Sequence, residues 1–583
     1  MTHAGPKPTA WLDRSELRIG LGCMRMSTEA DRDLDLAQQT IAAALDAGVT
    51  VFDTAHAYGL NEDDLGHNER LLARAIRRAS PGRSPRIVTK GGMTRIGGGW
   101  VPDGRAKTIL ADCQASLDAL DGLPIDLYLI HAPDPRTAWR TSVRALQRLL
   151  DDGLVERIGV SNVNLGQLDE ALSLVPVAAV QVAFSVYDDR AVRGGVLDRC
   201  TERGIPVIAH SPLGGPRRAR SLARRQPLAE VALAWLLELS PNVVAIPGAR
   251  RPETARSAAR AAGLTLAPDD LAQLERAFEV SRCTRSTKAP PARADGAEVV
   301  VIMGIPGAGK TRLAESYAAR DYVRLNRDEQ GGALHELAGA LDRQLASGAR
   351  RVVLDNTYLT RAARSYVLEV AHRHGIPVGC VWLETPLAQA QVNLVERLLD
   401  RFGALPTPAD LRALARREPG ALAPAQQMRT VRELEPPSPE EGFASVEITP
   451  FTRARGSARA RAGVFVAAAA LRQAGWREAL EQRADPAAPH LVFDWRPDGT
   501  SGDLAPLVEL VRATAAAGAP VDAALCPHSG GPPRCWCRPP LPGLPLAFAR
   551  THDIDPARSI LIGASPAHRT LAAALGARYV ACG

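Results

Sequence analysis

Three groups of side chains in this chain have the types and spacing that chemistry requires. The first is an acid–base set of a carboxylate, a phenol, an ammonium and an imidazole, each near the end of a short apolar run: Asp53, Tyr58, Lys90 and His131. The second is a glycine-rich loop that ends in a lysine and a threonine, GIPGAGKT at 304–311. The third is a set of soft metal ligands: Cys526, His528, Cys535 and Cys537.

The glycine-rich loop has the form GxxxxGK[ST] and lies between an apolar strand sequence, EVVVIM, and a helical sequence, RLAESYA. Glycines at three positions allow backbone N–H groups to face phosphates: Gly304, Gly307 and Gly309. Lys310 can neutralise the charge of the β- and γ-phosphates, and the Thr311 hydroxyl is a ligand for Mg²⁺. The motif therefore predicts an ATP site with Mg²⁺.

The cysteine and histidine ligands fall into two close pairs, Cys526 with His528 and Cys535 with Cys537. Two such pairs can close a tetrahedron around one ion, which is the geometry of structural Zn²⁺. Nine cysteines in 583 residues are too few for a disulfide framework in a chain of this size. We therefore expect one zinc ion at these four residues.

Regular elements must position these sites. Val- and Ile-rich runs such as VTVFDTA, DLYLIHA and VVAIPGA alternate with amphipathic helical stretches, which predicts an α/β fold with a (β/α)8 TIM barrel over 1–280. An aperiodic linker is expected at 281–297, followed by a P-loop α/β kinase domain over 298–455. A small α/β domain over 456–583 is expected to open with a helix in AGVFVAAAALRQAGW and to contain the strands LVFDW, DAALCP and SILIGA.

The barrel sequence resembles the aldo-keto reductases from about residue 17 to 278, because VFDTAHAYG, NERLLARAI, VTKGG, LIHAPDP, IGVSN, VQVAF, SPLGG and IPGARRPE occur in order. The resemblance implies that Tyr58 is the general acid in reduction of a small carbonyl compound and that His131 orients the carbonyl. It also implies that Lys90 and Asp53 set the pKa of Tyr58. A phenol with a pKa near ~10 is a poor acid at neutral pH unless a cation lowers that pKa.

The same resemblance assigns a nicotinamide cofactor to the barrel. The positions that hold the nicotinamide amide are matched by Ser161, Asn162 and Gln181. A loop that cradles the pyrophosphate is matched by Ser211, Leu213 and Gly214. His210 stands where the family usually has a stacking aromatic residue. Basic side chains follow IPG, where a 2′-phosphate would lie, and favour NADP(H) over NAD: Arg250, Arg251 and Arg256.

The P-loop domain resembles the 5′-hydroxyl polynucleotide kinases in the motifs YVRLNRDEQGG, VVLDNTYLTRAAR and LETPLAQAQVNLVERLLDRFG. The resemblance implies that Asp328 is the base that activates the acceptor hydroxyl and that Asp355 lies near Mg²⁺. It also implies that a lid arginine closes over the phosphates, with Arg397 the first candidate and Arg401 the second.

The acceptor of this kinase would be the 5′-OH end of DNA or RNA. Gly331 stands where some members carry an arginine that grips the 3′ phosphate of the acceptor, and Arg364 is a candidate substitute. Small-molecule P-loop kinases share the fold, so a sugar or another metabolite is the alternative acceptor.

The segment CPHSGGPPRCWCRPPLPG resembles the zinc loop of HAD-type phosphatases related to the histidinol phosphatases. That family expects DxDGT at the first strand, a lysine after the zinc loop and GDxxxD near the end. Here the first motif reads Asp494-Trp-Arg-Pro-Asp498, and the later positions hold Pro539, Ala564 and His568. We therefore expect a degenerate HAD-like domain that binds zinc but hydrolyses no phosphomonoester.

The composition adds little to these motifs. The net charge of +7 is compatible with a nucleic-acid partner but is spread over a long chain. No stretch reaches ~18 consecutive apolar residues and the first residues hold no signal-peptide core, so we expect a cytoplasmic protein without a membrane segment. The motifs together predict a carbonyl reductase fused to a polynucleotide kinase, acting in nucleic-acid repair or end modification. The alternative is a barrel that only senses NADP or acts as a scaffold, joined to a kinase that phosphorylates a small metabolite.

Overall fold

A computed structural model of the protein describes residues 11–13, 15–79, 84–215, 217–219, 228–278, 290–291, 296–331, 334–414, 418, 420–452, 461–531 and 533–582. The chain divides into two compact units, Met1–Arg285 and Ser286–Gly583. The predicted linker at 281–297 lies mostly outside the described residues. The second unit contains two sheets, which belong to the predicted P-loop domain and to the C-terminal domain.

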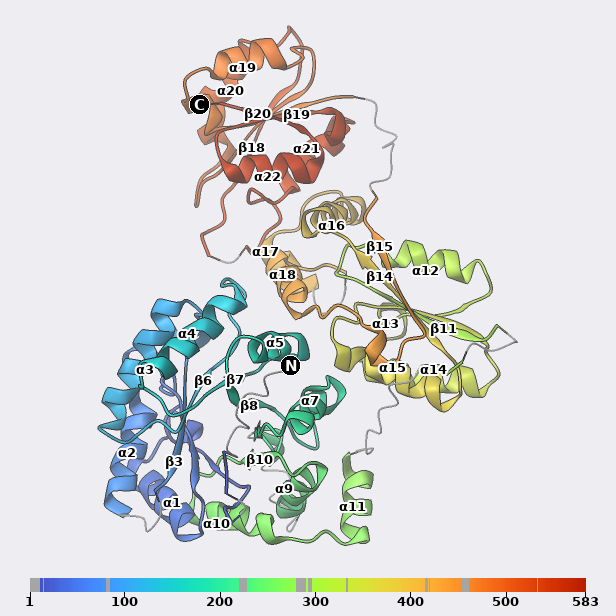
Figure 1. Ribbon diagram of the computed structural model, residues 1–583. Coiled ribbons are helices and arrows are strands. Elements are labelled where there is room, and N and C mark those ends of the chain that lie inside the picture. The colour runs from blue at the N-terminus through green and yellow to red at the C-terminus, as the bar shows by residue number, and fades with distance from the viewer. Residues whose placement is uncertain are drawn as a thin grey trace, which may run out of the picture. The chain divides into compact units, whose positions relative to one another are not determined.

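The first unit is a barrel of eight parallel strands surrounded by helices (Figure 1). In sheet order the strands are β1 (Leu21–Gly22), β2 (Val51–Asp53), β3 (Arg86–Gly91), β6 (Leu127–Ile130), β7 (Ile158–Ser161), β8 (Val177–Ala183), β9 (Val207–His210) and β10 (Val243–Ile246). Parallel bridges from Ile19 to Ala245 and from Gly22 to Gly248 join the first strand to the last. This arrangement fits the predicted TIM barrel.

The helices of this unit cover the outside of the strands. They are α1 (Leu34–Asp46), α2 (His67–Ala79), α3 (Ala106–Leu120), α4 (Trp139–Asp151), α5 (Leu165–Leu172), α6 (Arg190–Arg193), α7 (Val196–Arg203), α9 (Leu228–Leu239), α10 (Pro252–Arg260) and α11 (Pro268–Phe278). A hairpin of β4 (Met93–Ile96) and β5 (Gly99–Pro102) follows β3.

Alternate strand residues separate the two cores of the barrel. Val51 and Leu127 belong to an interior cluster, whereas Phe52 and Tyr128 belong to the cluster formed with the helices. This alternation follows from the two-residue period of a strand. Trp11, which is 2% exposed, packs against the interior cluster and donates its indole N–H to the Asp126 carboxylate at 2.5 Å. Trp11 therefore lies at the amino-terminal end of the strands, opposite the end that carries the predicted site.

The P-loop domain has a five-stranded parallel sheet in the order β12-β13-β11-β14-β15. Its strands are β11 (Glu298–Met303), β12 (Val323–Leu325), β13 (Arg351–Asp355), β14 (Val378–Glu384) and β15 (Ser445–Pro450). Its helices are α12 (Lys310–Ala318), α13 (Arg327–Gln330), α14 (Leu334–Ala346), α15 (Arg361–Arg373), α16 (Leu387–Phe402), α17 (Pro408–Leu414) and α18 (Pro424–Glu433). The chain reverses its direction of strand addition at β11, so the loop after β11 lies where parallel sheets bind ligands.

The C-terminal domain has a second five-stranded parallel sheet, in the order β18-β17-β16-β19-β20. Its strands are β16 (Val464–Ala467), β17 (His490–Trp495), β18 (Val521–Cys526), β19 (Ile560–Gly563) and β20 (Arg578–Ala581). Its helices are α19 (Trp476–Arg483), α20 (Ala505–Arg512), α21 (Gly543–Thr551) and α22 (Pro566–Leu575).

The prediction that this domain begins with a helix was wrong. Val464, Phe465 and Val466 lie in β16, the central strand of the sheet, and the alanine-rich residues that follow form only a short 3-10 turn at Ala470–Arg472. β-Branched and aromatic side chains favour a buried strand, and here that preference outweighs the helical preference of alanine. β17, which carries Asp494, is therefore the second strand of the domain and not its first.

One apolar core joins the P-loop domain to the C-terminal domain. Leu394, Leu398 and Leu399 on α16 belong to the same buried cluster as Phe465 on β16 and Leu561 on β19. In addition, the Gln389 amide donates to the backbone carbonyl of Ala574 at 3.0 Å. The two sheets of the second unit are thus held together by buried apolar surface.

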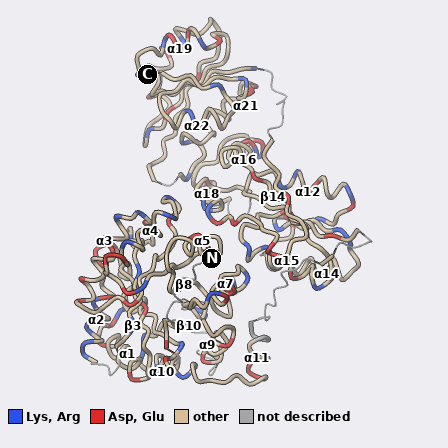
Figure 2. The backbone as a smooth tube through the Cα atoms, in the orientation of Figure 1, with Lys and Arg blue, Asp and Glu red and all other residues tan. Residues whose placement is uncertain are grey.

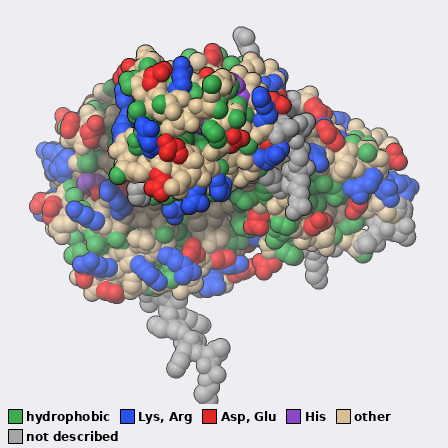
Figure 3. All heavy atoms as spheres, turned by 90° about the horizontal axis from the view of Figure 1, so that it is seen from above, with side chains coloured by type: hydrophobic (Ala, Val, Ile, Leu, Met, Phe, Trp, Pro, Cys, Tyr) green, Lys and Arg blue, Asp and Glu red, His purple; other side chains and the backbone are tan. Residues whose placement is uncertain are grey.

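No helix among the described residues is both long enough and apolar enough to cross a membrane. Basic and acidic residues are interspersed along the backbone (Figure 2), and both kinds of side chain are mixed over the face shown in Figure 3.

Arg364 does not have the predicted role of gripping the acceptor. Its side chain is completely buried in the P-loop domain and forms two hydrogen bonds with the Glu441 carboxylate, at 2.8 and 2.6 Å. It also donates to the backbone carbonyls of Tyr358 and Glu435. These contacts tie α15 to the segment that leads into β15, so Arg364 is a structural residue.

This burial predicts that Arg364→Ala destabilises the second unit by about 3–5 kcal/mol, because it leaves the Glu441 charge buried without its partner. Arg373→Ala on the same helix is the control. Arg373 has a side chain that is 60% exposed and lies 3.8 Å from Asp342, and its loss should change stability by less than ~0.5 kcal/mol. Urea denaturation of the full chain measures both; equal effects would contradict the assignment.

Candidate active sites and metal site

The predicted acid–base residues of the barrel meet at the carboxyl ends of β2 and β3. The Lys90 ammonium, which is 0% exposed, donates to Asp53 Oδ1 at 2.7 Å and to the Thr54 carbonyl at 2.8 Å, and lies 3.2 Å from the Tyr58 hydroxyl. Gln181, predicted to hold the cofactor, donates to the same Asp53 oxygen at 2.7 Å. Asp53 therefore fixes the ammonium beside the phenol.

His131 and Trp100 form the aromatic surroundings of the phenol. The ring of Tyr58 lies edge-on to His131 at 5.6 Å and to Trp100 at 6.0 Å between centroids. Trp100 lies on β5, and the Arg95 guanidinium stacks over it at 3.8 Å. Trp100 was not predicted, because it follows three glycines and belongs to no periodic pattern or motif. His131 Nδ1 is buried without a hydrogen-bond partner among the described residues, and burial lowers the pKa of His131 well below its usual value, so the ring is neutral.

The expected lowering of the Tyr58 pKa is not found. Burial, and then the negative charge of Asp53, raise the pKa of Tyr58 well above 10. Burial also lowers the pKa of Lys90. The physical reason is that Asp53 compensates the cation while the dry surroundings penalise the phenolate. Tyr58 is consequently protonated at neutral pH, which is the form that a proton donor needs at the start of a reaction.

The residues predicted to hold the nicotinamide amide lie at the end of β7 and in β8, and His210, at the predicted stacking position, ends β9. Asn162 donates to the carbonyl of His131 at 3.0 Å, and its Oδ1 lies 3.0 Å from His210 Nε2. Ser161 is completely buried and lies within hydrogen-bond distance of the Asn162 amide, at 3.2 Å. Burial lowers the pKa of His210 to about 4, so this imidazole ring is uncharged at neutral pH. The structure thus brings Ser161, Asn162 and His210 together.

The predicted pyrophosphate loop follows β9. Ser211 has a positive φ of 51° and is exposed, and Leu213 packs against the outer core. Gly214 also has a positive φ, of 74°, and a Cβ added there would lie 2.4 Å from the Tyr187 ring. The predicted 2′-phosphate residues lie around the start of α10: Arg251 and Arg256 are exposed, whereas the Arg250 guanidinium lies 3.1 Å from the Asp31 carboxylate.

The P-loop follows β11 and carries its three glycines at positive φ, with Gly307 at 87°. A Cβ added to Gly307 would lie 2.3 Å from the Ala390 carbonyl, so only glycine fits there. Lys310 Nζ donates to the carbonyls of Gly304 and Ile305 at 2.9 and 3.0 Å, which holds the ammonium over the loop. Gly309 is the N-cap of α12, so the loop leads directly into a helix amino terminus.

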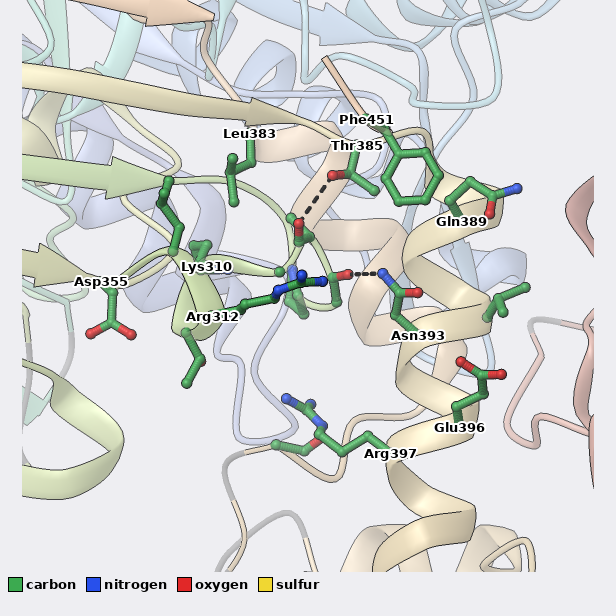
Figure 4. Close-up of a pocket in the computed structure, with 18 of the residues that line it drawn as sticks. Lys310, Arg312, Asp355, Leu383, Thr385, Gln389, Asn393, Glu396, Arg397 and Phe451 are labelled. Atoms are coloured by element: carbon green, nitrogen blue, oxygen red, sulfur yellow. Dashed lines mark hydrogen bonds between the residues drawn. The ribbon is translucent and has the colours of Figure 1, made fainter. Parts of the chain in front are cut away.

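Three side chains hold the outer carbonyls of the loop, and none was predicted. Thr385 donates to Ala308, Asn393 to Gly307 and Gln427 to Pro306, at 3.1, 2.8 and 2.9 Å. Figure 4 shows the first two of these contacts. These contacts fix the positions of three successive carbonyls on the outer side of the loop. A single sequence contains no signal for these donors, because they come from the turn after β14, from α16 and from α18, and meet only in the fold.

An open cavity of about 1790 Å³ lies over the P-loop. Its lining includes the predicted Thr311, Asp355 and Arg397, and also Phe451 after β15 (Figure 4). Arg397 donates to the Gly420 carbonyl at 2.8 Å. Arg401, the second lid candidate, pairs with Glu418 and is not among the lining residues.

Asp355 is buried, and its carboxylate receives hydrogen bonds from Arg324 at 2.8 and 3.2 Å and from Asn326 at 2.8 Å. Arg324 was not predicted, although it lies only four positions before Asp328. The predicted base Asp328 belongs to α13, and its side chain lies outside the described part of the chain.

The four predicted zinc ligands come together after β18. Their ligand atoms all lie within 4.8 Å of one another, with Cys537 Sγ 3.2 Å from His528 Nδ1 and Cys526 Sγ 3.7 Å from Cys535 Sγ. Three sulfurs and one imidazole nitrogen at such separations fit the donor set of a tetrahedral zinc site.

The carboxyl edge of the C-terminal sheet contains few acidic groups. β16 ends at Ala467 and is followed by further alanines, and the Arg472 guanidinium lies 3.5 Å from the Asp494 carboxylate on the neighbouring strand. His568 Nδ1 accepts from the Ala564 N–H at 3.2 Å. Asp498 has a positive φ of 58° in the turn after β17.

Comparisons with known proteins bear on two of the three domains. The family model of the aldo/keto reductase family matches residues 18–225, and that of an AAA domain matches residues 299–419. An uncharacterized oxidoreductase of Schizosaccharomyces pombe is 27% identical over 271 residues, which are 44% of this chain and 85% of the relative. A probable aldo-keto reductase of Glycine max is 28% identical over 307 residues, 45% of this chain and 86% of the relative.

Among solved structures, an aldo/keto reductase from Klebsiella pneumoniae in complex with NADP and acetate is 26% identical, with a TM-score of 0.36, and covers 46% of this chain and 92% of its own. The sequence matches support an aldo/keto reductase-like domain in the N-terminal half and a kinase-like P-loop domain in the middle. The HAD-like family of the C-terminal domain stays a prediction.

A buried acid–base cluster lies beside the barrel site. His56 Nδ1 lies 3.9 Å from Glu69 Oε2, and His56 Nε2 lies 3.9 Å from Asp112 Oδ1. Burial raises the pKa of Glu69 from 4.5 to about 7 and that of Asp112 from 3.8 to about 6. The Thr89 hydroxyl donates to the other oxygen of Glu69 at 2.5 Å.

Glu69 should therefore make the barrel less stable as the pH rises. Between pH 4.5 and 7 the folded carboxyl is protonated while the unfolded one is ionised, so folding takes up a proton and stability falls through this window. The wild-type barrel should lose free energy of unfolding between pH 5 and pH 8, and Glu69→Gln should remove up to about 3 kcal/mol of that loss. Calorimetric melting of the barrel at both pH values measures this, with Glu156→Gln, whose side chain is 54% exposed, as the control. An unchanged pH dependence in Glu69→Gln would refute the account.

Proposed function

We propose that the barrel is an NADPH-dependent reductase of small aldehydes or ketones. The observation that carries this proposal is the buried arrangement in which Lys90 bonds to Asp53 and lies 3.2 Å from the Tyr58 hydroxyl. It is supported by the match of this region to the aldo/keto reductase family. The bound cofactor would supply the hydride, and the residues of the chain manage the proton.

Tyr58 is the proton donor in this proposal. Its high pKa keeps the proton in place until negative charge develops on the substrate oxygen, and the nearby ammonium then stabilises the phenolate that remains. His131 is neutral, and one of its ring nitrogens can donate to the same oxygen. Trp100 lies edge-on to both rings and forms one wall of the space beside the phenol.

The residues present fit a nicotinamide cofactor. Asn162 and Ser161 offer amide and hydroxyl groups beside the neutral ring of His210, and Ser211 to Gly214 form an open loop after β9. Arg251 and Arg256 are exposed cations at the start of α10 and on it, and α10 follows β10, the neighbour of β9; such cations favour the 2′-phosphate of NADP(H).

Replacement of Tyr58 by Phe should remove turnover and leave cofactor binding unchanged, since only the proton is lost. We expect a fall in kcat of at least ~10²-fold in NADPH oxidation with an aldehyde panel. Tyr128→Phe is the control, because the Tyr128 hydroxyl donates to the Ile109 carbonyl on the outer face of the barrel. A wild-type protein that binds no nicotinamide cofactor would exclude the proposal, whereas tight binding without turnover would favour a sensor.

For the P-loop domain, we propose transfer of the γ-phosphate of ATP to the 5′-hydroxyl of DNA or RNA. The observation that supports phosphate transfer is the P-loop itself. Three side chains hold its outer carbonyls, and a large cavity lies over it. Lys310 and Thr311 would hold the phosphates and Mg²⁺, Asp328 would accept the proton of the hydroxyl, and Arg397 would stabilise charge on the transferred group. Phe451, at the cavity wall, offers a ring on which a base can stack.

The proposal of a nucleic-acid acceptor rests on the sequence resemblance at Asp328, and the open cavity of about 1790 Å³ is compatible with it. Both oxygens of Asp355 already accept hydrogen bonds from Arg324, so a bound Mg²⁺ would share this carboxylate with the guanidinium. A small metabolite is the alternative acceptor. Either acceptor would use the same phosphate-binding residues.

Lys310→Met and Asp328→Ala should each lower the rate of phosphate transfer by orders of magnitude, because one removes charge stabilisation and the other proton acceptance. Radiolabelled ATP is offered with 5′-OH DNA, 5′-OH RNA and a set of metabolites. Arg343→Met, an exposed change on α14, is the control. Full activity of Asp328→Ala would rule out its role as base, and labelling of metabolites alone would rule out the nucleic-acid acceptor.

For the C-terminal domain, we propose a structural zinc ion at Cys526, His528, Cys535 and Cys537, without phosphatase activity. Their clustered ligand atoms support the first part. The second is supported by Pro539, Ala564 and His568, which stand where a lysine and two acidic ligands are needed to neutralise a phosphate dianion.

Elemental analysis of the purified chain should find one zinc per protein, and Cys537→Ser should lower this content because it removes a ligand. Cys582→Ser, in the same domain and outside the cluster, is the control. Absence of zinc would exclude the metal site. Mg²⁺-dependent phosphate release from 3′-phosphorylated oligonucleotides, abolished by Asp494→Ala, would exclude the inactive assignment.

A further inference from the structure

The loop that carries the Cys/His cluster also contacts the P-loop domain. Trp536 stands between the cluster residues Cys535 and Cys537, is 1% exposed and donates its indole N–H to the Leu422 carbonyl at 2.9 Å. A few residues earlier in the same loop, the Pro533 carbonyl accepts from the N–H of Ala425 at 3.2 Å. Two hydrogen bonds thus join this loop to the segment 420–427.

The segment 420–427 is part of the wall of the phosphotransfer cavity. Gly420 and Leu422 line the cavity, and the Gly420 carbonyl accepts from the Arg397 guanidinium at 2.8 Å. Gln427, completely buried in α18, donates to the Pro306 carbonyl of the P-loop at 2.9 Å. The segment that Trp536 holds therefore carries a partner of Arg397 and a partner of the P-loop.

We propose that Trp536 is a positioning residue for the phosphotransfer site. Through Leu422 it fixes the Gly420 carbonyl and hence the Arg397 guanidinium, and through α18 it fixes the P-loop carbonyl of Pro306. The proposal rests on the phosphotransfer function proposed above. It requires no chemistry in the C-terminal domain, which acts through its fold.

The indole is suited to this role because it has a single N–H donor and a large apolar body. A buried N–H without an acceptor is unfavourable, so the position of the Leu422 carbonyl is tied to that of the ring. The ring is held by the buried cluster that includes Leu398 and Leu411, and its neighbours in sequence belong to the Cys/His cluster. The ring therefore has little freedom to follow a displaced segment.

The test compares Trp536→Phe with Trp495→Phe in the full chain. Each change removes one indole N–H from the same domain, but Trp495 is 40% exposed and donates to the His528 carbonyl, at 2.8 Å, rather than to the wall of the cavity. Affinity for a fluorescent ATP analogue and kcat/KM for ATP are measured. Trp536→Phe should lower both the affinity for the ATP analogue and kcat/KM for ATP by about 5–10-fold, the effect of one lost hydrogen bond. Trp495→Phe should change either quantity by less than twofold.

The same comparison is made in an Arg397→Ala background, where a positioning role predicts a smaller effect of Trp536→Phe, because only the path through Pro306 remains. An unchanged affinity in Trp536→Phe, or an effect of full size in the Arg397→Ala background, overturns the proposal. If Trp536→Phe does not fold, Ala425→Pro removes the second hydrogen bond in the first turn of α18, where proline is tolerated, and should weaken ATP use in the same way. The phosphotransfer proposal itself fails if the wild-type chain binds no ATP. If the wild type binds ATP but neither Trp536→Phe nor Ala425→Pro changes its affinity, only the positioning role of Trp536 is refuted.

Discussion

The strands of the barrel and of both five-stranded sheets all run parallel, and the positions of the candidate sites depend on this constraint. Parallel strands bring their carboxyl ends to one edge, so polar residues that follow separate strands become neighbours. Asp53 and Lys90 meet in this way at the ends of β2 and β3, and the P-loop meets Asp355 at the ends of β11 and β13. The Cys/His cluster likewise begins at Cys526, the last residue of β18.

Burial decides the electrostatics more than the sign of the neighbouring charge does. Tyr58 lies beside a cation, yet its pKa rises because the surroundings are dry and Asp53 balances that cation. Arg364 has the charge to bind a phosphate, yet it is enclosed with Glu441 and never reaches the cavity. In both cases the residue type suggested one behaviour and the surroundings imposed another.

Sequence reasoning was reliable where a pattern is local. The alternation of apolar runs with helical stretches predicted the barrel, and the spacing of the P-loop and of the Cys/His pairs predicted which residues would gather. It was wrong or silent where the outcome depends on distant residues: β16 became a strand because the sheet forms around it, and Asn393 and Gln427 find the P-loop only through tertiary structure. The direction of the Tyr58 pKa belongs to this second kind, because burial cannot be read from a motif.

The apolar face of α16 bears on how the chain could have evolved. Val392, Leu394 and Leu398 are buried against the C-terminal sheet, although the helix also supplies Asn393 and Arg397 to the cavity. A shorter chain ending near residue 455 would expose these leucines to water and would tend to self-associate. A truncation that removes the last domain would therefore make the P-loop domain less soluble, which disfavours such a loss. The C-terminal sheet thus has a structural use as a cover for α16, whatever chemistry its own edge supports.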